Sequence, residues 1–252
     1  MGGLSISFFV YQVVKATRLV MLGAPDNRFD SWGIRIKEML VGWLGQKKVL
    51  RDKVAGTMHV LMFWGFLMLG SDMLDLVSAN YFSDKILPEF LNNPWNGIVE
   101  LGYMTALLGA LAALTRRVLF TPEKLKGKSQ LEGNFILVLI LTITSTSFII
   151  ESSENPSSIW EPLGHWVSGL GLSENFIVAS YWAHMISICC FLVLIPVSKH
   201  MHLVMAIPNV FFHDTQALGK MRPLAIGDDG KAVPLEDLDI DSFGVSTFDQ
   251  YT

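Results

Sequence analysis

Charged residues are scarce in this chain of 252 residues. Asp, Glu, Lys and Arg together make up 17% of it, whereas an ordinary soluble domain carries about 25%. Hydrophobic residues make up 51%, and they gather in several stretches of roughly 20 residues that contain almost no charge. The sequence therefore excludes a soluble globular domain and predicts an integral membrane protein.

Cysteine is nearly absent too. The two cysteines, Cys189 and Cys190, are adjacent inside an apolar run, so they cannot join distant segments, and no CxxC spacing for zinc or an iron–sulfur cluster exists. We expect both thiols to serve packing. The first apolar run lacks a basic region before it, so no signal peptide is expected. The net charge of −4 comes largely from an acidic tail, which argues against nucleic-acid binding.

The apolar runs predict an all-α integral membrane bundle of about five transmembrane helices. The strongest runs are residues 55–77, 94–114, 134–150 and 175–197, each close to the length of about 20 residues that crosses the hydrocarbon as a helix. A fifth run, 4–23, is interrupted by Lys15 and Arg18. A β-barrel would need short alternating segments, which are absent.

Basic residues predict the orientation. Counted in chain order from the run 4–23, they concentrate between the first and second runs, between the third and fourth, and after the fifth. The other two connections hold only Lys85. By the positive-inside rule, the N-terminus is outside and the C-terminus is cytoplasmic. We therefore expect a multi-pass protein of a prokaryotic inner membrane, with a membrane domain at 1–215 and a cytoplasmic extension at 216–252.

Histidines at membrane depth are candidate functional residues, because a polar ring in hydrocarbon is costly unless it is satisfied. His59 lies near the cytoplasmic start of the second run. His184 and His202 are 18 residues apart, so a continuous helix would place both on one face, about 27 Å apart. His202 would then lie at the depth of His59, and His200 would point to the opposite face.

Two imidazoles on antiparallel helices at one depth are suited to a membrane haem. Gly56, Gly65 and Gly70 would let a macrocycle approach the backbone, or would serve close helix packing instead, and Phe63, Trp64 and Phe66 would offer flat walls.

His184, which would lie toward the outer leaflet, leaves several roles open. His184 either ligates a haem alone, shares it with a ligand from another helix, or hydrogen-bonds a quinone. Asp72 and Glu100 are the acidic residues expected to lie below the outer interface, where a carboxylate can exchange protons with a quinone.

Four short stretches resemble the gamma-subunit-like b-type cytochrome of respiratory nitrate reductase, and more closely the membrane domain of heterodisulfide-reductase-related iron–sulfur oxidoreductases. In chain order they read PDNRFD (25–30), GTMHVLMFWGF (56–66), SKHMH (198–202) and AIPN (206–209). The resemblance implies five helices, haem b, and electron exchange with menaquinone or a similar quinone.

The resemblance also implies roles for single residues. His59 and His202 match the ligands of the cytoplasmic-side haem, and His184 matches one ligand of an outer haem. Leu69 stands where a two-haem gamma subunit has its other outer histidine, so one haem b is expected and a second stays open. The ending FGVSTFDQYT resembles the lead-in to a cysteine-rich iron–sulfur domain. Such a domain is either not included in this sequence or supplied by a separate subunit.

The sequence thus predicts a redox subunit that relays electrons between a membrane quinone and a cytoplasmic iron–sulfur partner. A second hypothesis is a transporter or channel whose histidines and acids line a water path, although no internal repeat supports it. A third hypothesis is a haem-free membrane anchor in which the histidines are merely packed.

Overall fold

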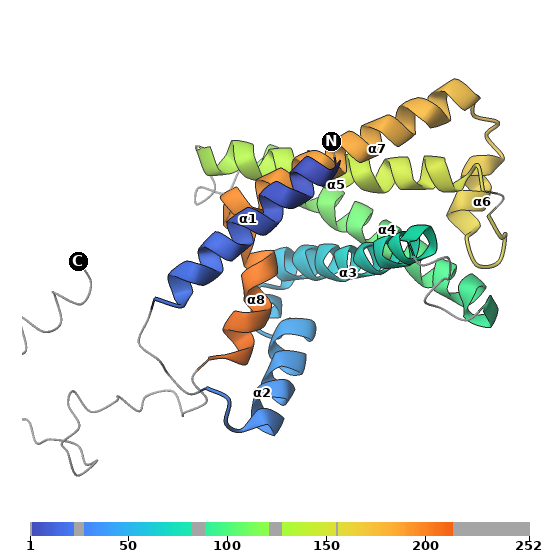
Figure 1. Cartoon of the computed structure of the whole chain (residues 1–252). Coiled ribbons are helices and arrows are strands. Elements are labelled where there is room, and N and C mark those ends of the chain that lie inside the picture. Colours follow the sequence, from blue (N-terminus) through green and yellow to red (C-terminus); the bar gives the residue numbers. More distant parts are fainter. Residues whose placement is uncertain (1, 23–27, 82–88, 121–127, 155, 214–252) are drawn as a thin grey trace, which may run out of the picture. The chain divides into compact units, whose positions relative to one another are not determined.

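The computed structural model describes residues 2–22, 28–81, 89–120, 128–154 and 156–213, without the side chains of 71–93, 128 and 129 (Figure 1). These residues form eight α-helices and no strand within the described ranges, so the all-α prediction is confirmed for them. They belong to a compact unit that ends at His213. The predicted extension 216–252 lies outside the described residues.

Four helices are long and apolar enough to cross a membrane. They are α3 (Lys53–Tyr81), α4 (Glu89–Phe120), α5 (Lys128–Glu151) and α7 (Glu174–Leu194). The first three contain the runs 55–77, 94–114 and 134–150, and α7 contains the run 175–197 up to Leu194. Their length and composition indicate a membrane protein.

The fifth predicted run forms helix α1 (Gly2–Val20), which packs along α7. It is not among the described helices apolar enough to span a membrane. Its glycines, hydroxyl side chains, Lys15 and Arg18 dilute the apolar character of its 19 residues. A fifth span therefore stays a prediction.

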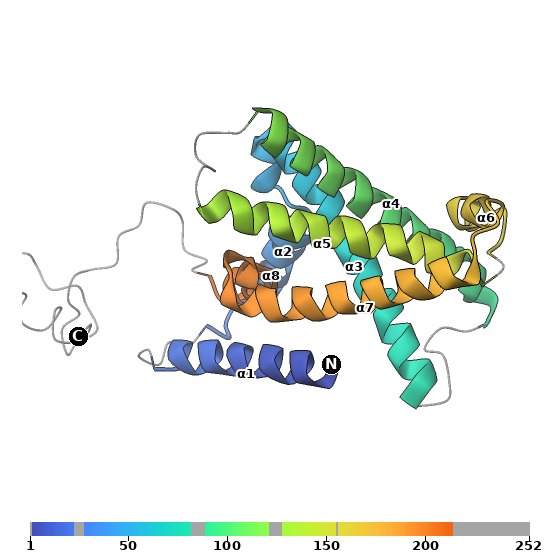
Figure 2. The same ribbon diagram turned by 90° about the horizontal axis from the view of Figure 1, so that it is seen from above.

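The long helices pack in chain order, α3 on α4, α4 on α5, and α5 on α7 (Figure 2). One buried cluster lies between α5 and α7, around Ile136, Leu139 and Phe191. A second lies between α4 and α5, around Tyr103 and Phe148. Each apolar helix thus buries one side against its neighbours and leaves the rest for lipid.

Small residues bring α3 and α4 into close contact. A Cβ added at Gly65 would lie 2.6 Å from the Cβ of Ala106 and 2.6 Å from the carbonyl oxygen of Gly102. A Cβ added at Gly109 would lie 2.9 Å from the carbonyl oxygen of Met58. Membrane helices associate by such packing, because lipid removes the hydrophobic drive between them.

Three short helices mark the two ends of the bundle. Helix α6 (Pro162–Ser168) packs on α5 at one end, which we call the α6 end. Helix α8 (His202–Phe211) lies at the other end, the α8 end, beside α2 (Trp32–Met39). Helix α2 continues into a π-helical turn, Leu40–Leu44.

A buried arginine ties α2 to the end of α8. The Arg35 guanidinium donates to the backbone carbonyls of Phe211 and His213, both at 2.9 Å, and to Oδ1 of Asp30 at 2.7 Å. The hydrogen bond from Arg35 holds the pKa of Asp30 below its ordinary value. These bonds satisfy carbonyls that α8 leaves unpaired at its C-terminus.

The close contact at Gly65 predicts a large effect of one methyl group. Gly65→Ala should destabilise the bundle by about 1–3 kcal/mol, because the new Cβ meets backbone atoms of α4 that cannot move aside. Thermal unfolding in detergent measures the loss. Gly70→Ala is the matched control, since nothing lies within 4 Å of a Cβ at Gly70. Equal melting temperatures of the two variants would contradict the packing account.

Candidate functional site

Two histidine rings face each other at the α8 end. His59 lies in the second turn of α3, and His202 is the first residue of α8. Their ring centroids are 6.3 Å apart, and the ring planes are inclined by 34°. The structure therefore brings together the two residues that the sequence pairs.

That separation fits a metal ion between the rings. A metal–imidazole nitrogen bond is about 2 Å long. An imidazole nitrogen lies about 1.1 Å from its ring centre, because the ring bonds are about 1.3 Å. Two imidazoles on opposite sides of one metal therefore have centroids roughly 6 Å apart, and the observed separation agrees with this value.

The protonation of His202 also suits a ligand. Its Nδ1 lies 2.8 Å from the carbonyl oxygen of Lys199. A carbonyl only accepts, so Nδ1 carries the proton and Nε2 is the basic nitrogen of the neutral ring. Metal-binding histidines are commonly oriented in this way by a carbonyl.

Aromatic side chains flank this pair. Phe63, one turn after His59, is buried and contacts Trp43 edge-on, with ring centroids 5.4 Å apart. Trp43 comes from the π-helical turn after α2. Trp43 could not be predicted from the sequence, because its place depends on how the segment between α2 and α3 folds against α3.

Trp64 and Gly56 do not flank the histidines as the sequence interpretation had it. Trp64 is five residues after His59, about 140° around the helix, and 40% of it is exposed. A Cβ at Gly56 would lie 2.3 Å from the carbonyl oxygen of Val49. Backbone atoms of Val49 thus occupy the space beside Gly56 that a macrocycle would need. Gly56 and Gly65 both serve close packing.

The continuous helix expected through His184 and His202 is wrong. Helix α7 ends at Leu194 and is followed by two 3₁₀ turns, Ile195–Val197 and Lys199–Met201. Pro196 removes a backbone donor, and Ser198 is extended, with φ −116° and ψ 174°. The two histidines therefore lie on separate helices and share no helix face.

The same break changes the position of His200. The sequence predicts it on the helix face opposite His202, but its half-buried ring lies beside that of His202, with centroids 5.9 Å apart. The Ser198 hydroxyl accepts from the backbone N–H of His200 at 3.1 Å. Burial, followed by the neighbouring His202, holds the pKa of His200 below its ordinary value.

His184 faces α5. Its Nδ1 lies 3.0 Å from Thr146 Oγ1 and 3.2 Å from the carbonyl oxygen of Ile143. The Thr146 hydroxyl can give its own proton to the carbonyl of Thr142, at 2.6 Å. Nδ1 of His184 therefore donates to α5, which fixes both the tautomer and the direction of the ring.

Glu100 is almost fully buried, with 2% of its surface exposed. Its Oε1 accepts from the backbone N–H groups of Leu163 at 2.6 Å and Gly164 at 2.8 Å, in the first turn of α6. The space at Gly164 is tight, since an added Cβ would lie 3.2 Å from the side chain of Glu151. The side chain of Asp72, also predicted at this end, lies outside the described part of the structure.

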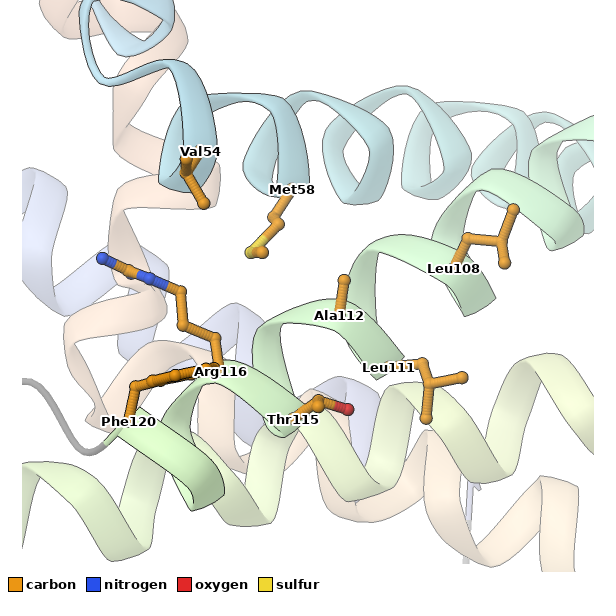
Figure 3. Close-up of a pocket in the computed structure, with 8 residues that line it drawn as sticks. All are labelled: Val54, Met58, Leu108, Leu111, Ala112, Thr115, Arg116 and Phe120. Carbon is orange, nitrogen blue, oxygen red and sulfur yellow. The ribbon is translucent and has the colours of Figure 1, made fainter.

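An apolar groove of about 530 Å³ runs between α3 and α4 toward the α8 end (Figure 3). Val54 and Met58 of α3 line it opposite Leu108 and Ala112 of α4, and Arg116 lies beside it. Its remaining polar group is the hydroxyl of Thr115.

No cluster of three or more His, Cys, Asp or Glu suited to a metal ion occurs among the described residues. Cys189 and Cys190 are both free thiols, each half-buried. Two facing imidazoles are nevertheless sufficient for a haem, since the macrocycle supplies the other four ligands.

The bundle is a helical membrane protein, and two curated proteins similar to it are oxidoreductases. The "Probable iron-sulfur-binding oxidoreductase FadF" of Bacillus subtilis is 27% identical over 242 residues, covering 90% of this chain and 34% of that protein. The "EtfAB:quinone oxidoreductase" of Syntrophomonas wolfei is 25% identical over 238 residues, covering 84% of this chain and 32% of that protein.

The chain is thus a distant homologue of both proteins and spans about a third of their length. No protein-family model matches it, and no solved structure matches it significantly. The similarity agrees with the iron–sulfur oxidoreductases that the sequence resembles.

The contact of His184 with α5 generates a prediction. Thr146→Val keeps the shape of the side chain but removes the acceptor of the Nδ1–H group, so it should cost about 1 kcal/mol of stability. The Ile143 carbonyl remains within reach and limits the loss. Thermal unfolding in detergent measures it against Thr142→Val, whose hydroxyl bonds only to the Val138 carbonyl of its own helix. If the control loses as much stability, the cross-helix bond contributes nothing.

Proposed function

We propose that the chain is the membrane electron-transfer subunit of a quinone-linked oxidoreductase, with haem b held between His59 and His202. The observation that carries the proposal is the separation of 6.3 Å between the two ring centroids. Iron bound by two imidazoles needs this separation.

The two relatives support the choice of reactants. The name of one states an iron–sulfur-binding oxidoreductase, and the name of the other states EtfAB and a quinone as its reactants. We extend these reactants to this chain as a membrane quinone of the menaquinone type and an iron–sulfur partner. Because the chain spans about a third of each relative, the partner is either a fused domain or a separate protein.

A haem b at this site would take up and release one electron at a time. The protein's part is to hold and orient the two imidazoles. The Lys199 carbonyl fixes the His202 ring through Nδ1–H, and Phe63 packs on Trp43 one turn after His59. The Arg35 bonds hold the end of α8, and with it His202, against α2.

The α8 end is proposed to face the cytoplasm. Arg28, Arg35, Lys37, Lys199 and other basic residues gather in the segments at this end, as the positive-inside rule requires. The soluble iron–sulfur partner would then meet the chain beside His59 and His202. Helix α1 would be a fifth crossing, with its N-terminus outside.

His184 is proposed to serve the quinone side of the reaction, directly or as ligand of a second haem. Its Nδ1–H is held by α5, so Nε2 is the nitrogen with ligand or acceptor character. Along α7 it lies ten residues before the end of the helix at Leu194, about 15 Å from the α8 end.

A reduced-minus-oxidised spectrum tests the haem site. His59→Ala and His202→Ala should each remove the low-spin b-type α band, because each removes one of the two imidazoles that would hold the iron. His200→Ala is the matched control, since its ring is a close neighbour of His202 but is not paired with His59. The band should survive in this control with an unchanged haem-to-protein ratio.

Two results would overturn the assignment. Retention of the full band in both single variants would move the ligands elsewhere. Absence of any haem from the intact protein purified from a haem-replete host would favour a haem-free anchor or a transporter.

The role of His184 has its own test. His184→Ala should lower quinone-linked turnover at least tenfold, equivalent to about 1.4 kcal/mol, while the band of the His59/His202 haem persists. Ser187→Ala, a buried polar residue three positions along the same helix, should leave turnover within twofold. Normal turnover in His184→Ala would make this histidine a packing residue.

A further inference from the structure

A second cavity, of about 350 Å³, lies at the α6 end. Ile98, Leu101 and Met104 of α4 form one wall, and Trp160 with Pro162 forms the other. The volume lies within the range of about 300–1,000 Å³ that is usual for small-molecule sites. Leu101 and Ile98 are also exposed on the membrane-spanning part of α4, so the cavity opens toward lipid.

One buried carboxylate lines this cavity. Glu100 contributes to its wall, although only 2% of the residue is exposed. Both hydrogen bonds of the side chain end on Oε1, which the first turn of α6 holds. Among the described residues nothing bonds to Oε2. An oxygen of a buried carboxyl group is therefore left for a ligand in an otherwise apolar site.

The ligand chemistry follows from these features. Apolar walls with an indole suit a flat ring with a hydrocarbon tail that enters from lipid. A carboxyl oxygen without a partner suits a carbonyl that must gain a proton, or a hydroxyl that must lose one. A quinone in its two redox states combines all of these properties.

The groove of Figure 3 is the competing position, and its polar groups fit less well. Its polar side chains are those of Arg116 and Thr115, whereas general acids and bases in proteins are His, Glu, Asp, Lys, Tyr or Cys. Neither group can deliver a proton to a carbonyl and then regain it. A carboxyl group can do both.

We propose that the quinone ring binds in the cavity at the α6 end and that Glu100 Oε2 exchanges protons with its nearer oxygen. This inference rests on the proposed function, since it names the site of that reaction. Reduction of one quinone to its quinol takes two electrons from the iron–sulfur partner and two protons. One proton goes to each carbonyl oxygen. Glu100 delivers one proton to the nearer oxygen and is reprotonated from water beyond the exposed Trp160 and Ile159, and the farther oxygen takes its proton from that water.

Helix α4, which forms one wall of the cavity, contacts α5 two residues from the partner of His184. Tyr103, one turn from Glu100 along α4, contacts Phe148 of α5 with ring centroids 5.7 Å apart. Phe148 is two residues from Thr146, the partner of His184.

A pair of filling substitutions tests the position. Leu101 and Leu108 are two turns apart on α4 and are 58% and 55% exposed, and each lines one of the two cavities. The probe is a short-chain menaquinone that carries a photoreactive azide, added to membranes that contain the intact protein. Leu101→Trp should reduce saturable labelling about tenfold, whereas Leu108→Trp should leave it within twofold.

The labelling pattern distinguishes the two cavities from each other. The reverse pattern would place the quinone in the groove of Figure 3 and overturn the inference, while the proposed function would stand. Equal labelling of both variants and the wild type would overturn it as well. No saturable labelling of the wild-type protein would contradict the proposed function itself.

A second variant isolates the proton step. Glu100→Gln keeps an oxygen that can accept from Leu163 and Gly164, so labelling should stay within twofold. The rate at which menadiol reduces the bound haem should fall at least tenfold, because the amide cannot take up a proton. Glu161→Gln is the matched control, since Glu161 is a buried carboxylate at the same end that bonds to Asn96 and Ser157 and does not line the cavity. An unchanged rate in Glu100→Gln would exclude the proton-exchange role.

Discussion

A backbone that leaves its helix exposes hydrogen-bonding groups, and at the break between α7 and α8 several of them find partners within the protein. Pro196 has no donor to lose, and the Ser198 hydroxyl accepts from His200. The Lys199 carbonyl accepts from His202 Nδ1. The last bond has two effects: it satisfies a carbonyl that the broken helix frees, and it selects the tautomer whose Nε2 can bind a metal. The position of His202 opposite His59 depends on this break.

The four long helices could be predicted from the sequence, because twenty apolar residues in lipid have few alternatives to a helix. The pairing of His59 with His202 could be predicted as well, from depth and from the resemblance. The predicted shared face of His184 and His202 is wrong, and Pro196 in the sequence already argues against an uninterrupted helix. The direction of Trp64 could also be predicted, since five residues turn a side chain far around the helix from His59.

Other parts of the site depend on contacts between helices that no local pattern specifies. The bond from His184 to Thr146 joins residues 38 positions apart, and Thr146 is one of several similar hydroxyl residues in α5. Glu100 was expected as a carboxylate below the interface. Glu100 bonds to the first turn of α6 because this short helix folds back toward α4. No pattern in the intervening sequence predicts this arrangement.

The glycine contacts between α3 and α4 affect the distance between sites on the two helices and not only the stability of the bundle. Backbones that touch at Gly65 and Gly109 cannot slide past each other without steric overlap, so the two helices hold one fixed register. His59 on α3 and Glu100 on α4 are therefore kept at a constant separation along the bundle. Electron tunnelling slows steeply with distance, and a fixed register keeps that distance from fluctuating. Under the proposed function, the small residues of this contact would hold constant the distance between the haem site and the quinone site.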